Sequence, residues 1–440
     1  MSKRLYIGCV ADDFTGAADG ASFLRRAGLS TVLINGIPEN ELGEIQAQAV
    51  VIALKSRTEE REKAVQDSLQ AFRWLKEKGA EILYFKYCST FDSTDQGNIG
   101  PVIDQVLETM EFPYTVLCPS LPVNGRTVKD GKLYVNGVLL EESHMKDHPL
   151  TPMRRSRIAE LMQVQGKYDC LETKIPPEQS LQKIIREKLD GGGHCYVVPD
   201  YETDLQGQQI VEAFSKLQFY TGGSGLLEHL GKKYGDGHAV DRDEKKRLKN
   251  LSKKVLLLAG SCSRATLEQI EDYKLRGLPF YQILPERVVV EQQTAEEIWE
   301  EAGAEEKEVI LLYSSASPQE VEQSQDLGKE RVSEALEAVM ARLALKAREQ
   351  GITKFVVAGG ETSGAVLKAL GYQAYRIGKS IAPGVPVLKA VGSDPVELVP
   401  KSGNFGQKDF FVRAIMELFG NCLSDREKNK GNIPKRTEVK

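Results

Sequence analysis

The chain has 440 residues, which is too many for one ordinary hydrophobic core and predicts two domains. Its 41% hydrophobic and 28% charged residues are typical of a globular protein and exclude a fibrous or largely disordered chain. The net charge of −5 argues against general binding to a nucleic-acid backbone, and no apolar run approaches the length of a membrane span. We therefore expect a cytoplasmic protein with no nucleic-acid or membrane partner, whose seven scattered cysteines are reduced.

The first half alternates apolar, strand-like runs with amphipathic stretches. The stretch 58–80 between two of these runs has apolar residues at helical spacing and a glycine near its end. Such strand–helix–strand units predict a mainly parallel sheet with helices on both faces. Further along, segment 119–143 carries Asn-Gly and Asp-Gly pairs between short alternating runs, which predicts β-hairpins. The strand-like runs are 5–11, 30–36, 49–56, 81–88 and 115–120.

A polar, glycine-containing segment over 232–253 is interpreted as the crossing between two domains. Beyond it, new strand-like runs and a long amphipathic helix over 329–351 resume the same pattern. The predicted fold class is α/β, with two domains that are each built on a mainly parallel sheet flanked by helices, and a cleft between them. The predicted domains are 1–240 and 250–423, followed by a disordered charged tail over 424–440.

Two adjacent carboxylates, Asp12 and Asp13, follow the first strand-like run and precede a helix-like segment. Ligands of open α/β sheets bind at the carboxyl ends of strands, where these residues are expected to lie. Capping of the following helix is the alternative interpretation, but one carboxylate is enough for that, and two adjacent acids repel each other. We therefore predict that Asp12 and Asp13 belong to a catalytic site.

Three loops rich in glycine and hydroxyl side chains occur in the second half, at 260–263, 359–364 and 401–406. The first two directly follow apolar strands, so their small residues let backbone N–H groups and a helix N-terminus approach phosphate oxygens. Each loop alone is consistent with an ordinary turn, but together they predict a phosphate or nucleotide site. The predicted nucleotide-binding residues, which include one from a later Pro-Gly turn, are Ser261, Ser263, Gly359, Gly360, Glu361, Thr362, Gly384 and Gly403.

Two common nucleotide-binding patterns are not supported. The G-x-G-x-x-G pattern is absent from these turns, and the Gly-Lys-Ser at 378–380 fails the P-loop pattern because position 373 is Gln. Lys379 and Lys389 flank the Pro-Gly turn and could bring positive charge to a triphosphate, although solvated surface lysines are equally common. The five histidines form no metal-binding pattern, and no metal-ligating residues are predicted.

Polar side chains also gather behind the strand-like runs of the first half. Cations, hydroxyls and an amide in one crevice suit a small polyhydroxy carboxylate, with Arg or Lys on the carboxylate and Asp, Asn or Ser on the hydroxyls. Ordinary turn chemistry is the alternative for any single Ser or Thr cluster. The predicted substrate-binding residues are Lys55, Arg57, Lys86, Ser89, Thr90, Asp92, Asn124, Arg126, Thr221, Gly222, Gly223 and Ser224.

Over nearly its whole length, the chain resembles the four-carbon acid sugar kinase family, and within it the 3-oxo-tetronate kinase branch. The motifs that carry this resemblance are VADDFTGAAD, ALKSR, FKYCSTFDST, PVNGRTV, HPLTPM, TGGSG, GSCS, AGGETS, IGKSIAPGVP and KSGNFG. The match is loose over 170–200, which puts peripheral substrate contacts in doubt more than the reaction. The resemblance implies an N-terminal acid-sugar-binding domain and a C-terminal nucleotide-binding domain, with nucleotide contacts at Ser261, Gly359–Thr362 and Gly403.

This family phosphorylates the terminal hydroxyl of tetronates with ATP, so the resemblance predicts a 3-oxo-tetronate 4-kinase that uses ATP and Mg²⁺. In that reaction Asp13 is the favoured base for the C4 hydroxyl, and Asp12 holds the substrate or a metal-bound water. The alternatives are a D-threonate or D-erythronate kinase of the same family, and a non-catalytic sensor that binds nucleotide and a sugar acid. A homodimer is the default expectation for the oligomeric state.

Overall fold

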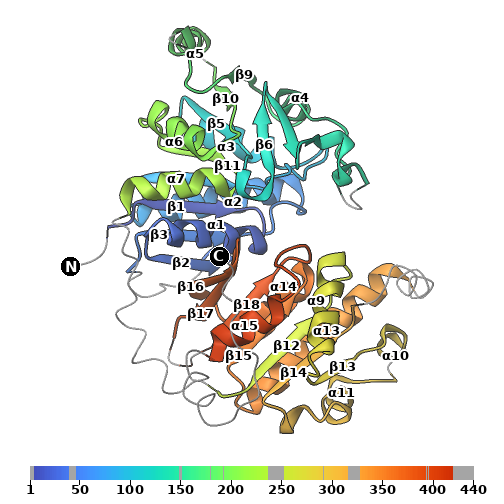
Figure 1. Ribbon diagram of the computed structural model, residues 1–440. Coiled ribbons are helices and arrows are strands. Elements are labelled where there is room, and N and C mark those ends of the chain that lie inside the picture. The colour runs from blue at the N-terminus through green and yellow to red at the C-terminus, as the bar shows by residue number, and fades with distance from the viewer. Residues whose placement is uncertain are drawn as a thin grey trace, which may run out of the picture. The chain divides into compact units, whose positions relative to one another are not determined.

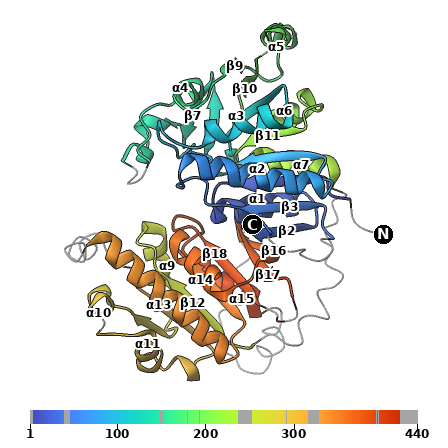
Figure 2. The ribbon, with the colours of Figure 1, turned by 180° about the vertical axis from the view of Figure 1, so that it is seen from behind.

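The computed structural model describes residues 4–38, 46–147, 151–178, 180–191, 193–235, 252–290, 292–315, 328–392, 394 and 396–419. The chain forms two compact units (Figures 1 and 2). The first contains Met1–Asp241 and Gln373–Ile377, and the second contains Arg242–Tyr372 and Gly378–Lys440. Most of the predicted domain crossing, the predicted tail 424–440 and the first three residues of the HPLTPM motif lie outside the described residues.

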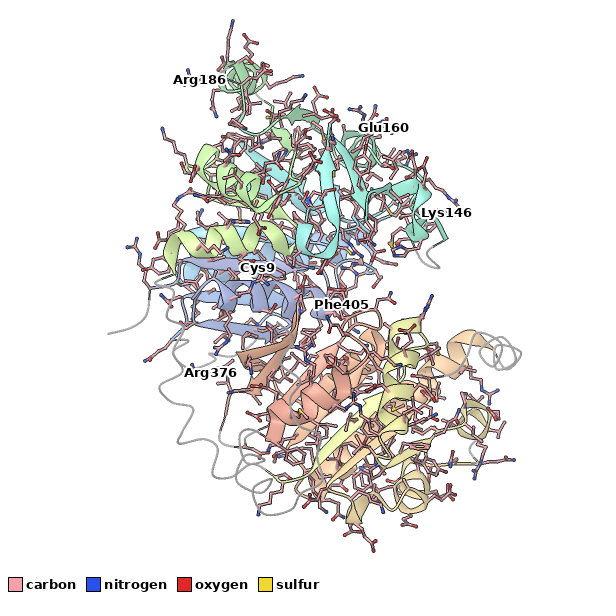
Figure 3. All side chains as sticks on the ribbon, viewed as in Figure 1. Cys9, Lys146, Glu160, Arg186, Arg376 and Phe405 are labelled. Carbon is pink, nitrogen blue, oxygen red and sulfur yellow. The ribbon has the colours of Figure 1, made fainter. Side chains whose placement is uncertain are left out.

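The sheet of the first unit has the strand order β2-β3-β1-β4-β11-β5-β10-β9, and every neighbouring pair in it is parallel. The first residues of β16 extend it by pairing antiparallel with β2. Apart from the edge strand β9, its strands are almost continuously buried and apolar, as expected for a parallel sheet covered on both faces; Cys9, for example, is buried in β1 (Figure 3). The strands are β1 (Ile7–Ala11), β2 (Thr31–Asn35), β3 (Ala49–Ala53), β4 (Ile82–Lys86), β5 (Tyr114–Cys118), β9 (Asp169–Thr173), β10 (Cys195–Pro199), β11 (Phe219–Gly222) and β16 (Ala374–Ala382).

Helices cover both faces of this sheet, with α1 against α7 on one face and α2 against α3 on the other (Figures 1 and 2). α2 buries a stripe of apolar residues in which the Phe72 ring meets the rings of Phe85 and Phe219 edge-on. α1 packs through small residues, since a Cβ at Gly20 would lie 3.0 Å from Leu227 of α7. The helices are α1 (Phe14–Arg26), α2 (Arg61–Glu77), α3 (Ile99–Met110), α4 (Ile158–Gln163), α5 (Ser180–Asp190), α6 (Asp204–Ala213) and α7 (Ser224–Tyr234).

The predicted hairpins form a small antiparallel sheet of β6 (Arg126–Lys129), β7 (Lys132–Val135) and β8 (Val138–Leu139). Its two turns are Asp130-Gly131 and Asn136-Gly137, and all four residues have positive φ. Two-residue hairpin loops of this type require positive φ at both positions, which Asn, Asp and Gly adopt most readily. The Asn-Gly and Asp-Gly signals therefore predicted these hairpins correctly.

The sheet of the second unit has the strand order β13-β14-β12-β15-β18-β17-β16, and its first five strands are parallel. The strands are β12 (Val255–Ala259), β13 (Phe280–Gln282), β14 (Val309–Tyr313), β15 (Lys354–Ala358), β17 (Val385–Ala390) and β18 (Glu397–Lys401), together with the later residues of β16. The helices are α9 (Arg264–Leu275), α10 (Pro285–Val289), α11 (Ala295–Glu301), α13 (Lys329–Glu349), α14 (Gly360–Leu370) and α15 (Phe410–Phe419).

Both units are thus α/β, each on a mainly parallel sheet flanked by helices, which confirms the predicted α/β class and the two-domain architecture. The long amphipathic helix predicted over 329–351 is α13. Among the described helices, none is both long and apolar enough to cross a lipid bilayer.

Candidate functional site

The polar residues of the first unit follow neighbouring strands of one parallel sheet. These residues lie in the loops that follow five strands, which are consecutive in the sheet order: β3, β1, β4, β11 and β5. The helices after β1 and β4 pack on opposite faces, which makes the gap between these two strands a topological switch point. Ligands of open α/β sheets bind in the crevice at such a point.

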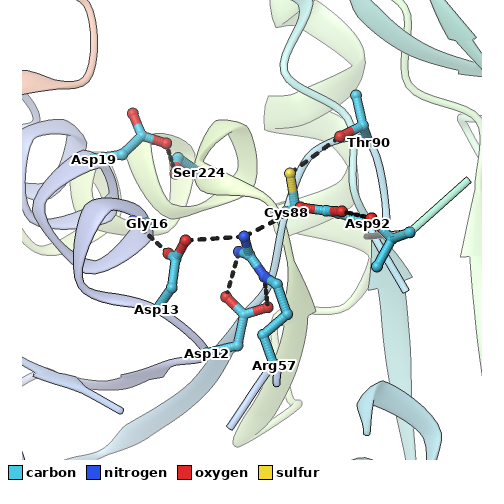
Figure 4. A network of polar contacts seen from close by, with 10 residues as sticks. Asp12, Asp13, Gly16, Asp19, Arg57, Cys88, Thr90, Asp92 and Ser224 are labelled. Carbon is cyan, nitrogen blue, oxygen red and sulfur yellow. Dashed lines mark hydrogen bonds and ion pairs between the residues drawn. The ribbon is translucent and has the colours of Figure 1, made fainter. Parts of the chain in front are cut away.

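Arg57 lies between the two adjacent carboxylates and bridges them (Figure 4). Its Nε and Nη2 atoms donate to the two oxygens of Asp12, both at 2.9 Å, and Nη1 lies 2.9 Å from Asp13 Oδ2. The same Nη1 donates to Asp92 Oδ2 at 3.1 Å. A bidentate guanidinium–carboxylate pair is a strong, orienting contact, so Arg57 offsets the repulsion between the two acids and holds both in place.

Asp12 and Asp13 differ in exposure and in pKa. The Asp12 side chain is 3% exposed, and burial raises its pKa despite the charge of Arg57. The Asp13 side chain is 32% exposed; burial opposes its charge, but Arg57, Lys86 and the Gly16 N–H together lower its pKa. Asp13 is therefore an ionised and partly exposed carboxylate, whereas Asp12 is its enclosed neighbour.

Asp13 is also the N-cap of α1, because its Oδ1 accepts a hydrogen bond of 2.6 Å from Gly16 N–H. The capping interpretation is thus correct for Asp13, and it does not exclude a site, since the other carboxylate oxygen contacts Arg57. Gly16 is needed for a second reason. A Cβ there would lie 2.5 Å from Lys86 Nζ and 2.4 Å from Asp13 Oδ1, so the Thr-Gly of the motif leaves room for both groups.

Lys86, the last residue of β4, is buried beside these acids. Burial opposes its charge, but the carboxylates of Asp19, Asp13 and Asp12 outweigh that effect and raise its pKa. Within the described part of the chain, no hydrogen bond or ion pair involves its Nζ. Lys86 is therefore a charged amine with donors available to a ligand.

Asp19 belongs to this cluster and was not predicted. It lies inside α1, where Ser224 Oγ donates to its Oδ2, and its buried Oδ1 has no hydrogen-bond partner among the described residues (Figure 4). Burial raises its pKa although Lys86 and Ser224 lower it. The contact between α1 and α7 brings Ser224 to Asp19, so Ser224 is one predicted site residue whose hydroxyl is already engaged.

The loop after β4 contributes Ser89, Thr90 and Asp92. Phe91 and Asp92 both have positive φ, an uncommon conformation for residues with a side chain and one that is often found at functional sites. It lets Asp92 turn back to Arg57 and also accept from Thr151 Oγ1. Thr90 is buried with its hydroxyl 3.1 Å from the Cys88 sulfur, whereas Ser89 is half-buried.

Other predicted substrate residues fall into three groups. Thr221 is fully buried and its hydroxyl donates to Val116 O at 2.8 Å, so it stabilises the sheet rather than facing a ligand. Gly222 and Gly223 allow close packing, since a Cβ on them would lie 2.1 Å from Cys118 O and 2.4 Å from Pro119 O respectively. Lys55 is exposed at the end of β3.

Arg126 and Asn124 lie where the hairpin sheet begins. The Arg126 Nη1 donates to Asn124 O, but its buried Nε has no partner within the described ranges. Burial lowers the pKa of this guanidinium, which is close enough to Cys88 to interact with it electrostatically. A half-buried guanidinium with an unpaired N–H is a ready binding group for a carboxylate.

In the second unit, the three predicted loops lie side by side. β12, β15 and β18 are neighbouring parallel strands, so the loops after them meet at one edge of the sheet. A Cβ at Gly260 would lie 2.3 Å from Thr362 Oγ1, and one at Gly403 would lie 2.2 Å from Ser261 Oγ. Glycine at these positions lets the three loops approach closely.

The start of α14 has the features of an anion-binding helix N-terminus. Its N-cap is Gly359, at φ 128°, a conformation that glycine adopts far more easily than other residues. Gly359 has no side chain to cap the helix, so the first-turn N–H groups of Gly360, Glu361 and Thr362 face outward without intrahelical acceptors. Ser263 differs, because its hydroxyl accepts from Thr266 N–H and caps α9.

The Pro-Gly turn before β17 is the fourth predicted element of this site. The antiparallel register of β17 with β18, continued from Leu388 opposite Leu398, brings Gly384 next to the end of β18. The flanking lysine Lys379 points elsewhere, to an ion pair of 2.6 Å with Glu417. A different lysine, Lys401, lies buried at the base of the loops, and the sequence analysis did not select it.

Comparison with known proteins agrees with this division of the chain. Residues 7–230 match the model of a sugar-binding N-terminal domain, and residues 256–411 match that of a nucleotide-binding C-terminal domain. Two curated relatives are named 3-oxo-tetronate kinase. That of Haemophilus influenzae is 40% identical, covering 93% of this chain and 98% of the relative, and that of Pectobacterium atrosepticum is 41% identical, covering 94% and 99%.

A solved structure from Salmonella typhimurium has a TM-score of 0.80 and 38% identity, covering 94% of this chain and 99% of that one. It is named a putative tRNA synthase, a name that differs from those of the curated relatives. The full-length identity and the two domain matches are decisive for the assignment. The chain therefore belongs to the four-carbon acid sugar kinase family and is a phosphotransferase with an alcohol group as acceptor.

Proposed function

We propose that the protein transfers the γ-phosphoryl group of ATP to the C4 hydroxyl of a four-carbon acid sugar, and that this sugar is 3-oxo-tetronate. The observation that carries this proposal is the Asp12–Arg57–Asp13 cluster beside the switch point of the sheet, in which one carboxylate, Asp13, is ionised and 32% exposed. The names of the curated relatives support the same reaction and substrate. A nucleotide-binding domain in the second unit supports ATP as the phosphoryl donor.

Asp13 is the proposed base. During transfer a bond forms between the C4 oxygen and the γ-phosphorus, the bond from that phosphorus to the ADP oxygen breaks, and the hydroxyl proton passes to Asp13. Arg57 fixes Asp13 through Nη1, and the N–H of Gly16 holds its other oxygen. Asp12 is the proposed anchor of Arg57, since both of its oxygens are engaged there.

Recognition of the acid is assigned to the groups that have unused hydrogen-bonding capacity. Lys86 Nζ and Arg126 Nε are cationic donors without partners in the described part of the chain, and either can bind a carboxylate. Ser89 and the exposed Lys55 are available for hydroxyls or for a phosphate product. Thr221 is left out of this set because its hydroxyl is used inside the sheet.

The nucleotide phosphates are assigned to the first turn of α14 and to the hydroxyl of Ser261. Phosphoryl transfer depends mostly on positioning and charge neutralisation, which backbone N–H groups at a helix N-terminus supply. Gly403 borders this position, since a Cβ there would lie 2.2 Å from Ser261 Oγ. The register of β17 with β18 brings Gly384 to the same end of the sheet.

Mg²⁺ is expected with the nucleotide. In the residues that the structure describes, no three His, Cys, Asp or Glu side chains gather around one point. Proteins bind Mg²⁺ through one or two carboxylates plus substrate phosphates, so such a cluster is not required. Glu361 is an exposed carboxylate in the first turn of α14, and we assign to it the protein contact with this ion. When bound, Mg²⁺ neutralises charge on the phosphate oxygens.

Gly403→Ala tests the arrangement of the loops. The new Cβ would displace the Ser261 and Ser263 hydroxyls, which lie 2.2 Å and 2.8 Å from its position. We expect the KM for ATP to rise by about 10-fold, the equivalent of one lost hydrogen bond or so, with little change in the KM for the acid. Gly364→Ala is the matched control, since no atom lies within 4 Å of its Cβ position in α14. Equal effects of the two substitutions on the ATP KM would contradict the assignment.

The reaction is tested by measuring ADP release with Mg-ATP and a panel of 3-oxo-tetronate, D-erythronate, and L- and D-threonate, with a no-acid control. ADP release that depends on 3-oxo-tetronate is the expected result. Turnover with threonate or erythronate alone would support the kinase activity but would show that the substrate is one of these acids and not 3-oxo-tetronate. Nucleotide and acid binding with no ADP release from any acid would favour the non-catalytic sensor.

A further inference from the structure

Lys401, the last residue of β18, is a buried lysine that no carboxylate neutralises in the described part of the chain. Its side chain is fully enclosed, and its Nζ donates to Thr266 Oγ1 at 2.9 Å, Gly403 O at 2.8 Å and Ser402 O at 3.2 Å. All three ammonium donors are therefore used on neutral oxygens. Burial lowers the pKa of Lys401 to about 7, which reflects how costly its charge is at this position.

The contacts of Lys401 orient the loop that follows it. In a planar trans peptide the C=O and N–H bonds point in opposite directions. Because the carbonyls of Ser402 and Gly403 point toward the ammonium, the N–H groups of Gly403 and Asn404 point away from it. Neither N–H has a hydrogen-bond partner among the described residues. Two consecutive unpaired N–H groups form a concavity suited to anions.

Further hydrogen bonds orient the other carbonyl groups of the loop in the same direction. Thr266 Oγ1 donates to Gly403 O at 2.9 Å, and Gln269 Nε2 donates to the carbonyls of Phe405 and Gly406, both at 3.0 Å. The loop carbonyls thus point to α9 and Lys401. On its other side, Gly403 lies against Ser261 of the proposed phosphate site.

We propose that Lys401 is a positioning residue for the nucleotide, which draws the loop carbonyls inward so that the Gly403 and Asn404 N–H groups face the phosphates. In its charged form, which a bound polyanion favours, Lys401 also places a positive charge behind those N–H groups and strengthens their contacts. This inference rests on the proposed function, in that the ligand of these loops is a nucleotide. It adds a cation that neither Lys379 nor Lys389 supplies.

The test is Lys401→Met, which keeps the length of the side chain and removes its charge and its donors. We expect the Kd and KM for Mg-ATP to rise by roughly 10-fold or more, the typical effect of losing a hydrogen bond to a charged group. The KM for the acid at saturating ATP should stay near that of the unmodified enzyme. Lys401→Gln, which restores a donor without charge, should recover part of the ATP affinity.

Lys354→Met is the matched control. Lys354 is a second buried lysine at an end of this sheet, but it lies at the start of β15, four residues or ~13 Å from the position that pairs with Lys401. Its loss should lower the melting temperature without raising the KM for ATP. If Lys401→Met folds and binds Mg-ATP as tightly as the unmodified enzyme, or if the two variants lose ATP affinity equally, the inference is wrong.

Lys401→Gln provides the same comparison if the Met variant does not fold. A failure of the proposed function can be distinguished from a failure of this inference, because in the first case the unmodified enzyme would not bind Mg-ATP at all. Tight binding by the unmodified enzyme and by a folded Lys401 variant would overturn the positioning role alone.

Discussion

Asp13→Asn is expected to lower kcat by about 10²–10⁴-fold, the usual contribution of a positioned acid–base group, with nearly unchanged affinity for ATP. Asn is as good an N-cap as Asp, so the hydrogen bond with the Gly16 N–H and the start of α1 should survive. What disappears is the negative charge that we propose accepts the C4 proton. The measurements are kcat from ADP release and the Kd for Mg-ATP by calorimetry.

Asp13→Ala separates the two roles of this side chain. It removes both the base and the cap, so it should lose as much turnover as the Asn variant and, in addition, about 1 kcal/mol of stability. The comparison uses kcat and urea unfolding of the two variants. A kcat near that of the unmodified enzyme in Asp13→Asn, or a loss of ATP affinity in that variant, would refute the assignment of Asp13 as base.

Arg57→Met is expected to destabilise the first unit by about 3–5 kcal/mol at neutral pH, because it leaves buried carboxylates without their partner. Arg57 contacts Asp12, Asp13 and Asp92 at 2.9–3.1 Å, and nothing else in the described part of the chain bridges all three. The free energy of unfolding in urea measures the effect. Turnover should fall as well, since Asp13 loses the group that orients it.

The loss should shrink as the pH falls. In the unmodified protein Arg57 is one of the groups that lower the pKa of Asp13, so that carboxylate stabilises the fold above its unfolded pKa and loses this contribution on acidification. Burial already raises the pKa of Asp12, and Arg57 is the largest group that opposes this effect at both acids. Its loss should move both pKa values upward, so the folded variant should bind protons more readily than the folded unmodified protein. Stability of the variant relative to the unmodified protein should therefore increase as the pH falls from neutral toward the ordinary carboxyl range of about 4.

Arg264→Met is the control for this pair of measurements. Arg264 forms an i,i+4 ion pair of 2.8 Å with Glu268 on α9, but its side chain is 92% exposed. Exposed pairs of this kind contribute at most about 1 kcal/mol. If Arg57→Met costs no more than Arg264→Met, or if its loss does not depend on pH, the buried cluster does not have the role assigned to it.

The α/β class, the hairpins and the long helix α13 could be predicted because they depend on local patterns. Apolar runs, helical spacing and Asn-Gly or Asp-Gly turns act over a few residues, and tertiary packing did not override them here. The alternation of strands and helices in the sequence also predicts that Asp13, Arg57 and Lys86 lie close together. They end neighbouring parallel strands, and such ends share one edge of a sheet.

Other residues acquired their roles only through packing between distant segments. Asp19 reads as a polar residue inside a helix, and it joins the cluster because α1 and α7 pack closely enough for Ser224 to reach it. Thr221 reads as a ligand-binding hydroxyl, yet its position inside the sheet directs it to Val116 O. Lys401 begins the predicted loop 401–406 but was not selected as a binding residue, and only the burial of β18 encloses it beneath that loop. Sequence patterns specify which residues share a strand or a helix face, whereas hydrogen bonding and burial of a side chain depend on neighbours far away in the chain.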